Sequence, residues 1–275
     1  MPKSKSSPAR RPAGTGAVTV TDPTKAIAAI SQSGVVTNRL GLTPVTVVTQ
    51  QGGAVMASHV NYRTRDRVIP DAEVFFVEGE KPAGDDPSLG EADKVAWRDA
   101  ATGYECIMLR EPNGGYLGGY VGIPKSHPLY GFEHEAVPAD IGIEVHGGLS
   151  YSRICNEGPS PKRSFVLTES RRICHTYEVH YKQATQAGDY RVEDAHAWWF
   201  GFDCNHVYDR GPEEKDGRGG YLSAETAATY RDDTYVMREI LNLAAQLKAI
   251  ADGDPVPPRE GPPLPPVGLE PEGGW

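Results

Sequence analysis

The chain has 275 residues, which is enough to bury the core of one large domain or of two small ones. Its formal net charge of −9 argues against a general nucleic-acid binder, whose affinity would come from neutralising phosphates, and leaves only a local basic arm for such a contact. No apolar stretch approaches the roughly 18 residues of a membrane span, and no apolar segment follows the basic N-terminus as in a signal peptide.

The four cysteines give information about the cellular compartment. Cys106, Cys155, Cys174 and Cys204 form no C-x-x-C pair. Their spacing therefore indicates neither a structural zinc knuckle nor a redox dithiol. Reduced thiols fit best, so we expect a cytoplasmic protein with no membrane partner.

Residues 1–20 combine a few basic residues with Ser, Pro, Ala and Gly, a composition that predicts a disordered basic arm. Residues 21–95 form an N-terminal segment, in which a short helix is expected from Asp22 to Gly34. β-Branched and aromatic runs in this segment predict three strands, over residues 45–49, 59–67 and 72–77. Residues 78–95 are rich in Gly, Pro and Asp. They predict a loop that either separates this segment from the main domain or joins the two in one domain.

The main domain, residues 96–251, is expected to begin with a hairpin. Its two strands cover residues 104–110 and 116–123, and the turn residues of Pro112-Asn-Gly-Gly115 join them. A further strand is predicted over residues 141–151, where apolar residues alternate with Glu144 and His146. This alternation would place Glu144 and His146 on one face of the sheet.

The stretch from Trp198 to Asp209 predicts a buried aromatic strand that ends in a polar loop. Asp203, Cys204, His206 and Asp209 are close together at its carboxyl end, where functional residues are often found. The clearest helix covers residues 229–250, because its apolar residues form one stripe. After it, residues 252–275 contain eight prolines and predict a disordered, extended tail.

These elements predict an α+β fold: a mostly antiparallel sheet packed by a C-terminal amphipathic helix, with disordered tails at both ends.

The polar residues near the two strand ends have the side-chain types of a divalent-metal site. If the strands are neighbours, His146, Asp203 and His206 would bind zinc or manganese, and Glu144 would be the general base. Cys204 would be a nucleophile, a ligand or a packed core residue. The alternative is a purely structural turn, in which Asp203 and the histidine bond to backbone groups. No spacing matches a known catalytic signature, so both alternatives stay open.

Four blocks of the chain, in order, resemble a family of small proteins of unknown function found in bacteriophages and bacterial genomes. The blocks are Gly119-Tyr-Val-Gly-Ile-Pro124 with His127-Pro-Leu-Tyr-Gly131, Val145-His-Gly-Gly-Leu-Ser-Tyr151, Trp198-Trp-Phe-Gly-Phe-Asp-Cys-Asn-His206 and Tyr230-Arg-Asp-Asp-Thr-Tyr-Val236. The resemblance covers roughly residues 103 to 250. It implies a cytoplasmic protein of a phage or its bacterial host, and it transfers no functional residue.

This sequence departs from the family pattern after Cys204. Members usually have F-D-C-A-H and then a glycine before the aspartate, whereas this chain has Asn205 and the pair Val207-Tyr208. The departure leaves Asp203, Cys204 and His206 intact and argues against a role for Asp209.

Two functional hypotheses follow. The first is a metal-dependent hydrolase that acts on a nucleotide or another small phosphorylated substrate. The alternative is a non-enzymatic accessory or binding protein, either an inhibitor of a host system or a virion component, which would use its tails to bind host or phage proteins. Nucleic acid is expected as a partner only through the N-terminal arm.

Overall fold

The computed structural model describes residues 18–19, 39–78, 86–112, 115–154, 166–174, 197–212 and 228–264. The helix predicted over residues 22–34, most of the basic arm and the end of the C-terminal tail lie outside the described residues.

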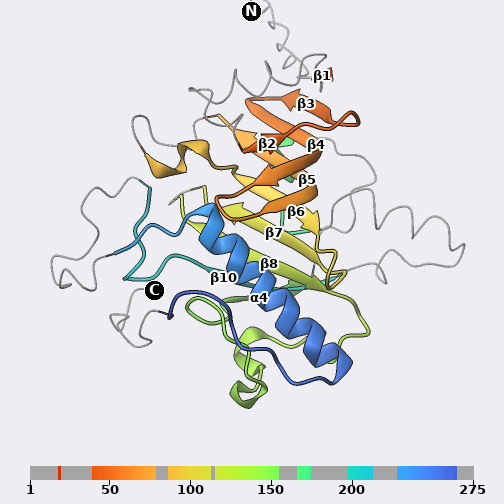
Figure 1. Cartoon of the computed structure of the whole chain (residues 1–275), viewed down its shortest axis with the longest axis vertical. Helices are drawn as coiled ribbons and strands as arrows, with labels where there is room; N and C mark the ends of the chain where they lie inside the picture. Colours follow the sequence, from red (N-terminus) through yellow and green to blue (C-terminus); the bar gives the residue numbers. More distant parts are fainter. Residues whose placement is uncertain are drawn as a thin grey trace, which may run out of the picture.

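The described chain forms one antiparallel sheet with a long helix across one face, which is the predicted α+β architecture (Figure 1). The strand order is β1-β3-β4-β5-β6-β7-β8-β10-β9, and β2 pairs with β4. The strands are β1 (Val18–Thr19), β2 (Leu40–Gly41), β3 (Val47–Gln51), β4 (Ala54–Arg63), β5 (Val68–Val77), β6 (Lys94–Arg98), β7 (Glu105–Arg110), β8 (Leu117–Ile123), β9 (Tyr151–Ile154) and β10 (Trp198–Asp203). Short helical turns lie at η2 (Pro87–Gly90), η3 (His134–Ala136), η4 (Ala139–Ile141) and α2 (Val166–Glu169).

Strand pairing continues across the predicted domain boundary. β6 pairs with β5 on one side and with β7 on the other. Residues of the N-terminal segment therefore share a sheet with the main domain, as the single-domain alternative requires. The strand predicted over residues 59–67 is offset, since β4 ends at Arg63 and Thr64 turns the chain by bonding to the Arg67 carbonyl at 3.0 Å.

The predicted hairpin between β7 and β8 is confirmed as an antiparallel pair. The strand predicted over residues 141–151 is wrong, because only its last residue, Tyr151, belongs to a strand. Gly142, Gly147 and Gly148 have φ values of 84°, 65° and 87°, which an extended strand does not contain. The alternation of apolar and polar residues here reflects a loop that contacts the helix at several points.

The helix α4 (Asp233–Asp252) lies across β7 and β8 (Figure 1). Its apolar stripe is buried, as predicted; the fully buried members are Val236, Met237, Ile240, Leu243, Ala244 and Leu247. The close approach requires a glycine on β8, since a Cβ at Gly119 would lie 2.5 Å from Cγ1 of Ile240. The helix begins four residues later than predicted because the Asp232 side chain caps it, accepting from the Tyr235 amide.

The first part of the Pro-rich segment is held along α4, although its composition predicted a disordered tail. The guanidinium of Arg259 pairs with the buried carboxylate of Glu239. The Asn242 side chain donates to the Glu260 carbonyl at 2.8 Å and accepts from the Glu260 amide at 3.1 Å. These side-chain contacts order an extended segment that has no apolar periodicity of its own.

A buried charge network holds the start of α4 against the sheet. Glu91 accepts from Arg110 and from the Tyr230 hydroxyl at 2.5 and 2.6 Å, and from the Asp233 amide at 3.0 Å. The Tyr62 hydroxyl donates to Asp233 at 2.8 Å. Burial and the neighbouring Glu91 carboxylate raise the pKa of Asp233 to about 6.

The raised pKa of Asp233 gives a testable pH dependence. Because the folded pKa lies above the usual 3.8, this carboxyl stabilises the fold most when protonated, and the stabilisation is lost as pH rises toward 6. The shift corresponds to up to about 3 kcal/mol. Relative to the Asp233→Asn variant, the wild type should therefore lose about 2 kcal/mol of unfolding free energy between pH 4.5 and 7, as pH rises through the folded pKa. Urea unfolding at several pH values measures this difference, and parallel curves for the two proteins would contradict it.

Candidate metal centre

Three side chains with metal-ligand atoms meet at the end of β10. Nε2 of His146 lies 2.8 Å from Oδ2 of Asp209, and Nδ1 of His206 lies 3.1 Å from the same oxygen. One ligand atom from each residue lies within 4.8 Å of the other two. Two imidazoles and a carboxylate are donors that zinc and other divalent transition metals use.

The three residues come from two segments of the chain. His206 and Asp209 belong to the turn after β10, which is closed by the Asp209 amide donating to the His206 carbonyl at 2.9 Å. The His206 amide also donates to Oδ2 of Asp209 at 3.1 Å. His146 comes from the loop before β9, and β9 pairs with β10. The register of this strand pair therefore brings the two segments together.

Outer contacts hold His146 and Asp209 in place. The hydroxyl of Tyr235, on α4, lies 2.8 Å from Nδ1 of His146, and the His146 amide donates to Glu239 at 3.2 Å. Nε of Arg231 donates to Oδ1 of Asp209 at 2.9 Å. Contacts of this kind orient the ligands of known metal sites and leave the inner atoms facing one another.

The cluster is buried and negatively charged at its centre. The side chains of His146 and Asp209 are 0% exposed, and that of His206 is 11% exposed. Burial disfavours ionisation of Asp209, but hydrogen bonds from His146 and His206 and the charge of His146 hold its pKa well below the usual range. Asp209 is therefore an anion at every pH near neutral.

Close packing fixes the orientation of the His206 ring. The ring stacks on Tyr208, with centroids 5.1 Å apart and planes 7° apart. Gly147 also lies against this ring, where a Cβ would be 2.1 Å from Cε1 of His206. Only glycine fits this position, both because of the ring and because φ is +65°.

The structure brings together two of the five predicted site residues, His146 and His206. Asp203 does not lie in the cluster: it accepts from the Ser150 hydroxyl at 2.8 Å and from the Asn205 amide at 3.2 Å. Glu144 is exposed and bonds through its backbone to Gln246, because the loop does not keep the predicted strand alternation.

Cys204 lies in the core next to the site. Burial and the charges of Asp209 and Asp203 raise the pKa of its thiol, which opposes the thiolate that a nucleophile needs. Cys106 and Cys204 are free thiols, whereas Cys174 is disulfide-bonded, so the expectation of reduced thiols is wrong for Cys174.

Asp209 is a member of the cluster against which the family pattern argued. Its position just after a buried strand indicated a functional residue, but the departure from the family pattern argued against a functional role for Asp209. Tyr235, Arg231 and Glu239 were missed as site residues because the helix-capping and apolar patterns of α4 explained that segment without them. Only the packing of α4 against the loop at His146 reveals their contacts.

Among the described residues, no helix is long and apolar enough to cross a membrane. Comparison with known proteins found no matching protein-family model, curated protein or solved structure.

Proposed function

We propose that this protein is a metal-dependent hydrolase whose centre is one divalent ion, zinc or manganese, held by His146, His206 and Asp209. The observation that carries the proposal is the convergence of three ligand atoms within 4.8 Å in a buried place. Two histidines and one carboxylate, with a further position open, form the donor set of hydrolytic zinc sites. Here Asp209 takes the ligand role that the sequence suggested for Asp203.

The surroundings suit this chemistry. A bound divalent ion lowers the pKa of a coordinated water and so supplies a hydroxide near neutral pH. Burial and the Glu239 carboxylate raise the pKa of Tyr235, so its hydroxyl keeps its proton and holds Nδ1 of His146. Of the three ligand side chains, His206 alone has exposed surface, so water and substrate would approach from its side.

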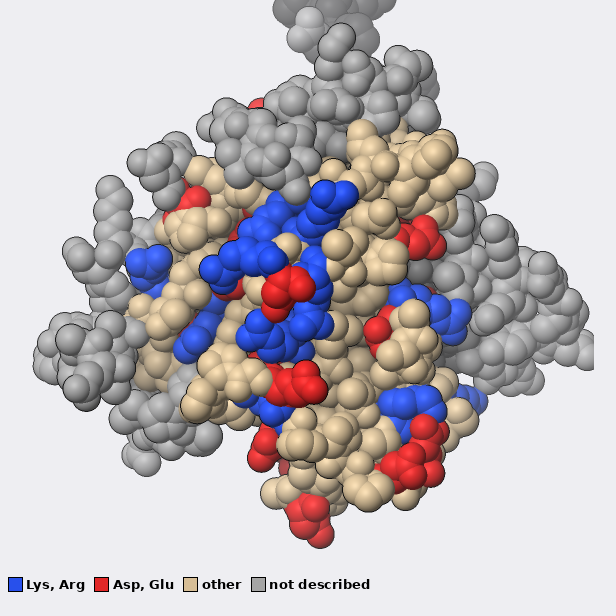
Figure 2. Space-filling view, viewed as in Figure 1, with Lys and Arg blue, Asp and Glu red and all other residues tan. Residues whose placement is uncertain are grey.

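The surface near the start of α4 favours an anionic substrate. Figure 2 shows Lys and Arg side chains gathered on the face that carries α4. Arg65 pairs with Asp232, and both Arg67 and Arg238 pair with Asp66. Arg231, whose side chain is 16% exposed, pairs with Asp209 in the cluster itself. Guanidinium groups match phosphate oxygens well, so a nucleotide or another small phosphorylated molecule is the proposed substrate class.

Measurement of bound metal tests whether His146, His206 and Asp209 hold an ion. The protein, purified without chelators, should carry about one equivalent of zinc or manganese by elemental mass spectrometry, and the His206→Ala and Asp209→Asn variants about a tenth of that or less. Asp203→Asn should keep the metal, since Asp203 lies outside the cluster. His134→Ala should keep it too, because His134 belongs to the separate Glu133–His134–Glu135 group. Loss of metal in the two control variants but not in the first two would contradict the assignment.

A second candidate function is a non-enzymatic binding protein. It is favoured by one observation: Oδ2 of Asp209 already accepts from both imidazoles and from the His206 amide, so the network is satisfied without an ion. Wild-type protein that stays metal-free after incubation with zinc and manganese would support this candidate. Metal-loaded protein that hydrolyses no nucleotide and no bis(p-nitrophenyl) phosphate would support a structural ion instead.

A further inference from the structure

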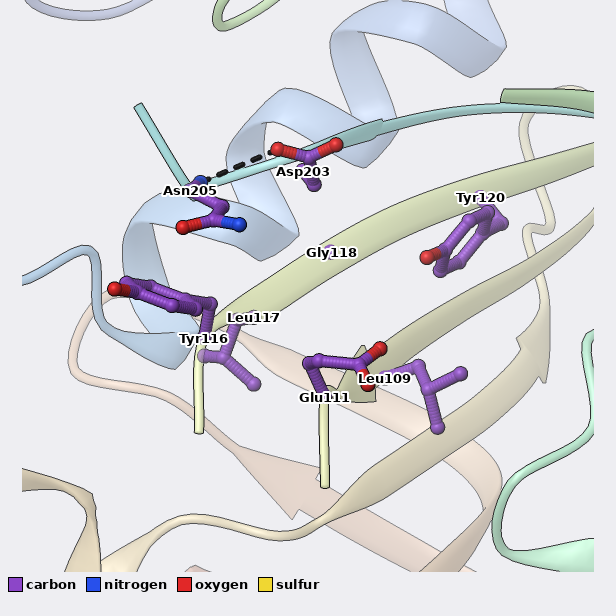
Figure 3. Close-up of a pocket in the computed structure, with 8 residues that line it drawn as sticks. All are labelled: Leu109, Glu111, Tyr116, Leu117, Gly118, Tyr120, Asp203 and Asn205. Carbon is purple, nitrogen blue, oxygen red and sulfur yellow. Dashed lines mark hydrogen bonds between the residues drawn. The ribbon is translucent and has the colours of Figure 1, made fainter. Parts of the chain in front are cut away.

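A second polar site lies on the face of the sheet opposite α4, in a pocket of about 210 Å³. Figure 3 shows its side chains beside the ends of β7, β8 and β10, with α4 behind the sheet. The lining residues are Leu109, Glu111, Tyr116, Leu117, Gly118, Tyr120, Asp203 and Asn205.

The end of β10 explains why this pocket is separate from the metal centre. Successive side chains point to opposite faces of a strand, and the chain continues this alternation just beyond Asp203. Asp203 and Asn205 face the pocket, whereas Cys204 is buried in the core that includes α4 and His206 belongs to the metal centre. The polar residues from Asp203 to Asp209, which the sequence suggested as one site, are therefore divided between this pocket and the metal centre.

The pocket has negative charge and no cationic lining residue among the described residues. Glu111 is exposed and has no ion pair in the described chain, so its carboxylate is available to a ligand. Asp203 is oriented by the Ser150 hydroxyl and the Asn205 amide, which leaves lone pairs on both of its oxygens. Two carboxylates beside one small cavity favour a cationic ligand.

Tyr120 gives independent support for a ligand. Its ring is fixed over Gly201, where a Cβ would lie 2.3 Å from Cδ1, and it meets Tyr151 edge-on with centroids 5.2 Å apart. Its hydroxyl points into the pocket and has no hydrogen-bond partner among the described residues (Figure 3). Burial and the charges of Asp203 and Tyr151 raise its pKa, so it is a neutral hydroxyl that can bond to a ligand.

The floor of the pocket is open because position 118 has no side chain. A Cβ at Gly118 would lie 2.9 Å from the Tyr120 hydroxyl oxygen and would occupy the space between that hydroxyl and β10. The apolar wall comes from Leu109, whereas the side chain of Leu117 is buried in the core cluster that includes α4. A volume of this size holds a small ligand rather than a drug-sized one.

We propose that this pocket binds a small organic cation, with an ammonium or guanidinium group between Glu111 and Asp203 and a short hydrocarbon part against Leu109. The site is independent of the proposed hydrolase centre.

Isothermal titration of the full chain with n-butylammonium and n-butylguanidinium tests this site, with n-butanol and glucose as neutral probes. Both cations should bind, and the affinity should fall as salt increases. The Glu111→Gln/Asp203→Asn double variant should weaken cation binding by about tenfold or more, with an unchanged thermal unfolding midpoint. The Gly118→Val variant should abolish binding by filling the cavity.

The metal-centre variant His206→Ala separates this proposal from the function proposed above. It should bind the cations as the wild type does, whether or not the metal centre is correct. Equal binding of butanol or glucose, or cation binding that survives both pocket variants, would overturn the assignment. An absence of heat with either cation at millimolar concentration would overturn it as well.

Discussion

Replacing Asp209 with alanine is expected to remove about 3–5 kcal/mol of unfolding free energy. The Asp209 carboxylate is fully buried and accepts from His146, His206 and Arg231. Without it, the guanidinium of Arg231, which is only 16% exposed, loses the anion that it pairs with in the described part of the chain. A buried cation left without its partner is far more costly than the lost hydrogen bonds alone.

The matched control is Asp203→Ala, six residues earlier at the end of β10 and partly exposed. It removes hydrogen bonds from Ser150 and Asn205 at the surface and should cost about 1 kcal/mol. Urea unfolding with a chelator present measures both variants without any contribution from bound metal. Equal losses in the two variants would show that the Asp209 network does not stabilise the fold.

Sequence patterns predicted the parts of this fold that depend on local periodicity. The apolar stripe of α4, the aromatic strand β10 and the hairpin of β7 and β8 each have their repeat within one short stretch. Contacts between residues that are far apart in the sequence had no such periodic pattern. Arg259 pairs with Glu239 across a proline-rich stretch, and nothing in its composition indicates this ion pair.

The candidate site shows the same difference between local patterns, which the sequence predicts, and long-range contacts, which it does not. His146 and His206 were expected to meet only if their two predicted strands were neighbours; the rings do lie 5.2 Å apart, because the loop of His146 leads into β9 and β9 pairs with β10. Asp203 was chosen over Asp209 although its side chain projects to the opposite face of β10. Strand alternation, applied beyond the last strand residue, would have separated Asp203 from His206. The turn that brings the Asp209 carboxylate back to the His206 amide could not be predicted from the sequence and is seen only in the structure.

Gly147→Ala is expected to cost about 3 kcal/mol or more and to empty the metal centre. The added methyl would lie 2.1 Å from Cε1 of His206 and 2.2 Å from Nε2, so the imidazole must leave its stack on Tyr208. A left-handed backbone at φ +65° adds about 1–2 kcal/mol of strain for any residue with a Cβ. Because the clash falls on a proposed ligand, the loss of stability and the loss of metal should occur together.

Gly148→Ala separates the clash from the strain. Gly148 has φ +87° and no atom within 4 Å of its Cβ position, so alanine there carries only the backbone cost of about 1–2 kcal/mol. This variant should keep its metal, whereas Gly147→Ala should not. Chemical unfolding and metal analysis of the two variants together measure how far the His206 position depends on one missing methyl group. If Gly147→Ala binds metal as well as Gly148→Ala does, His206 is not a ligand, because the imidazole cannot stay in place beside the new Cβ.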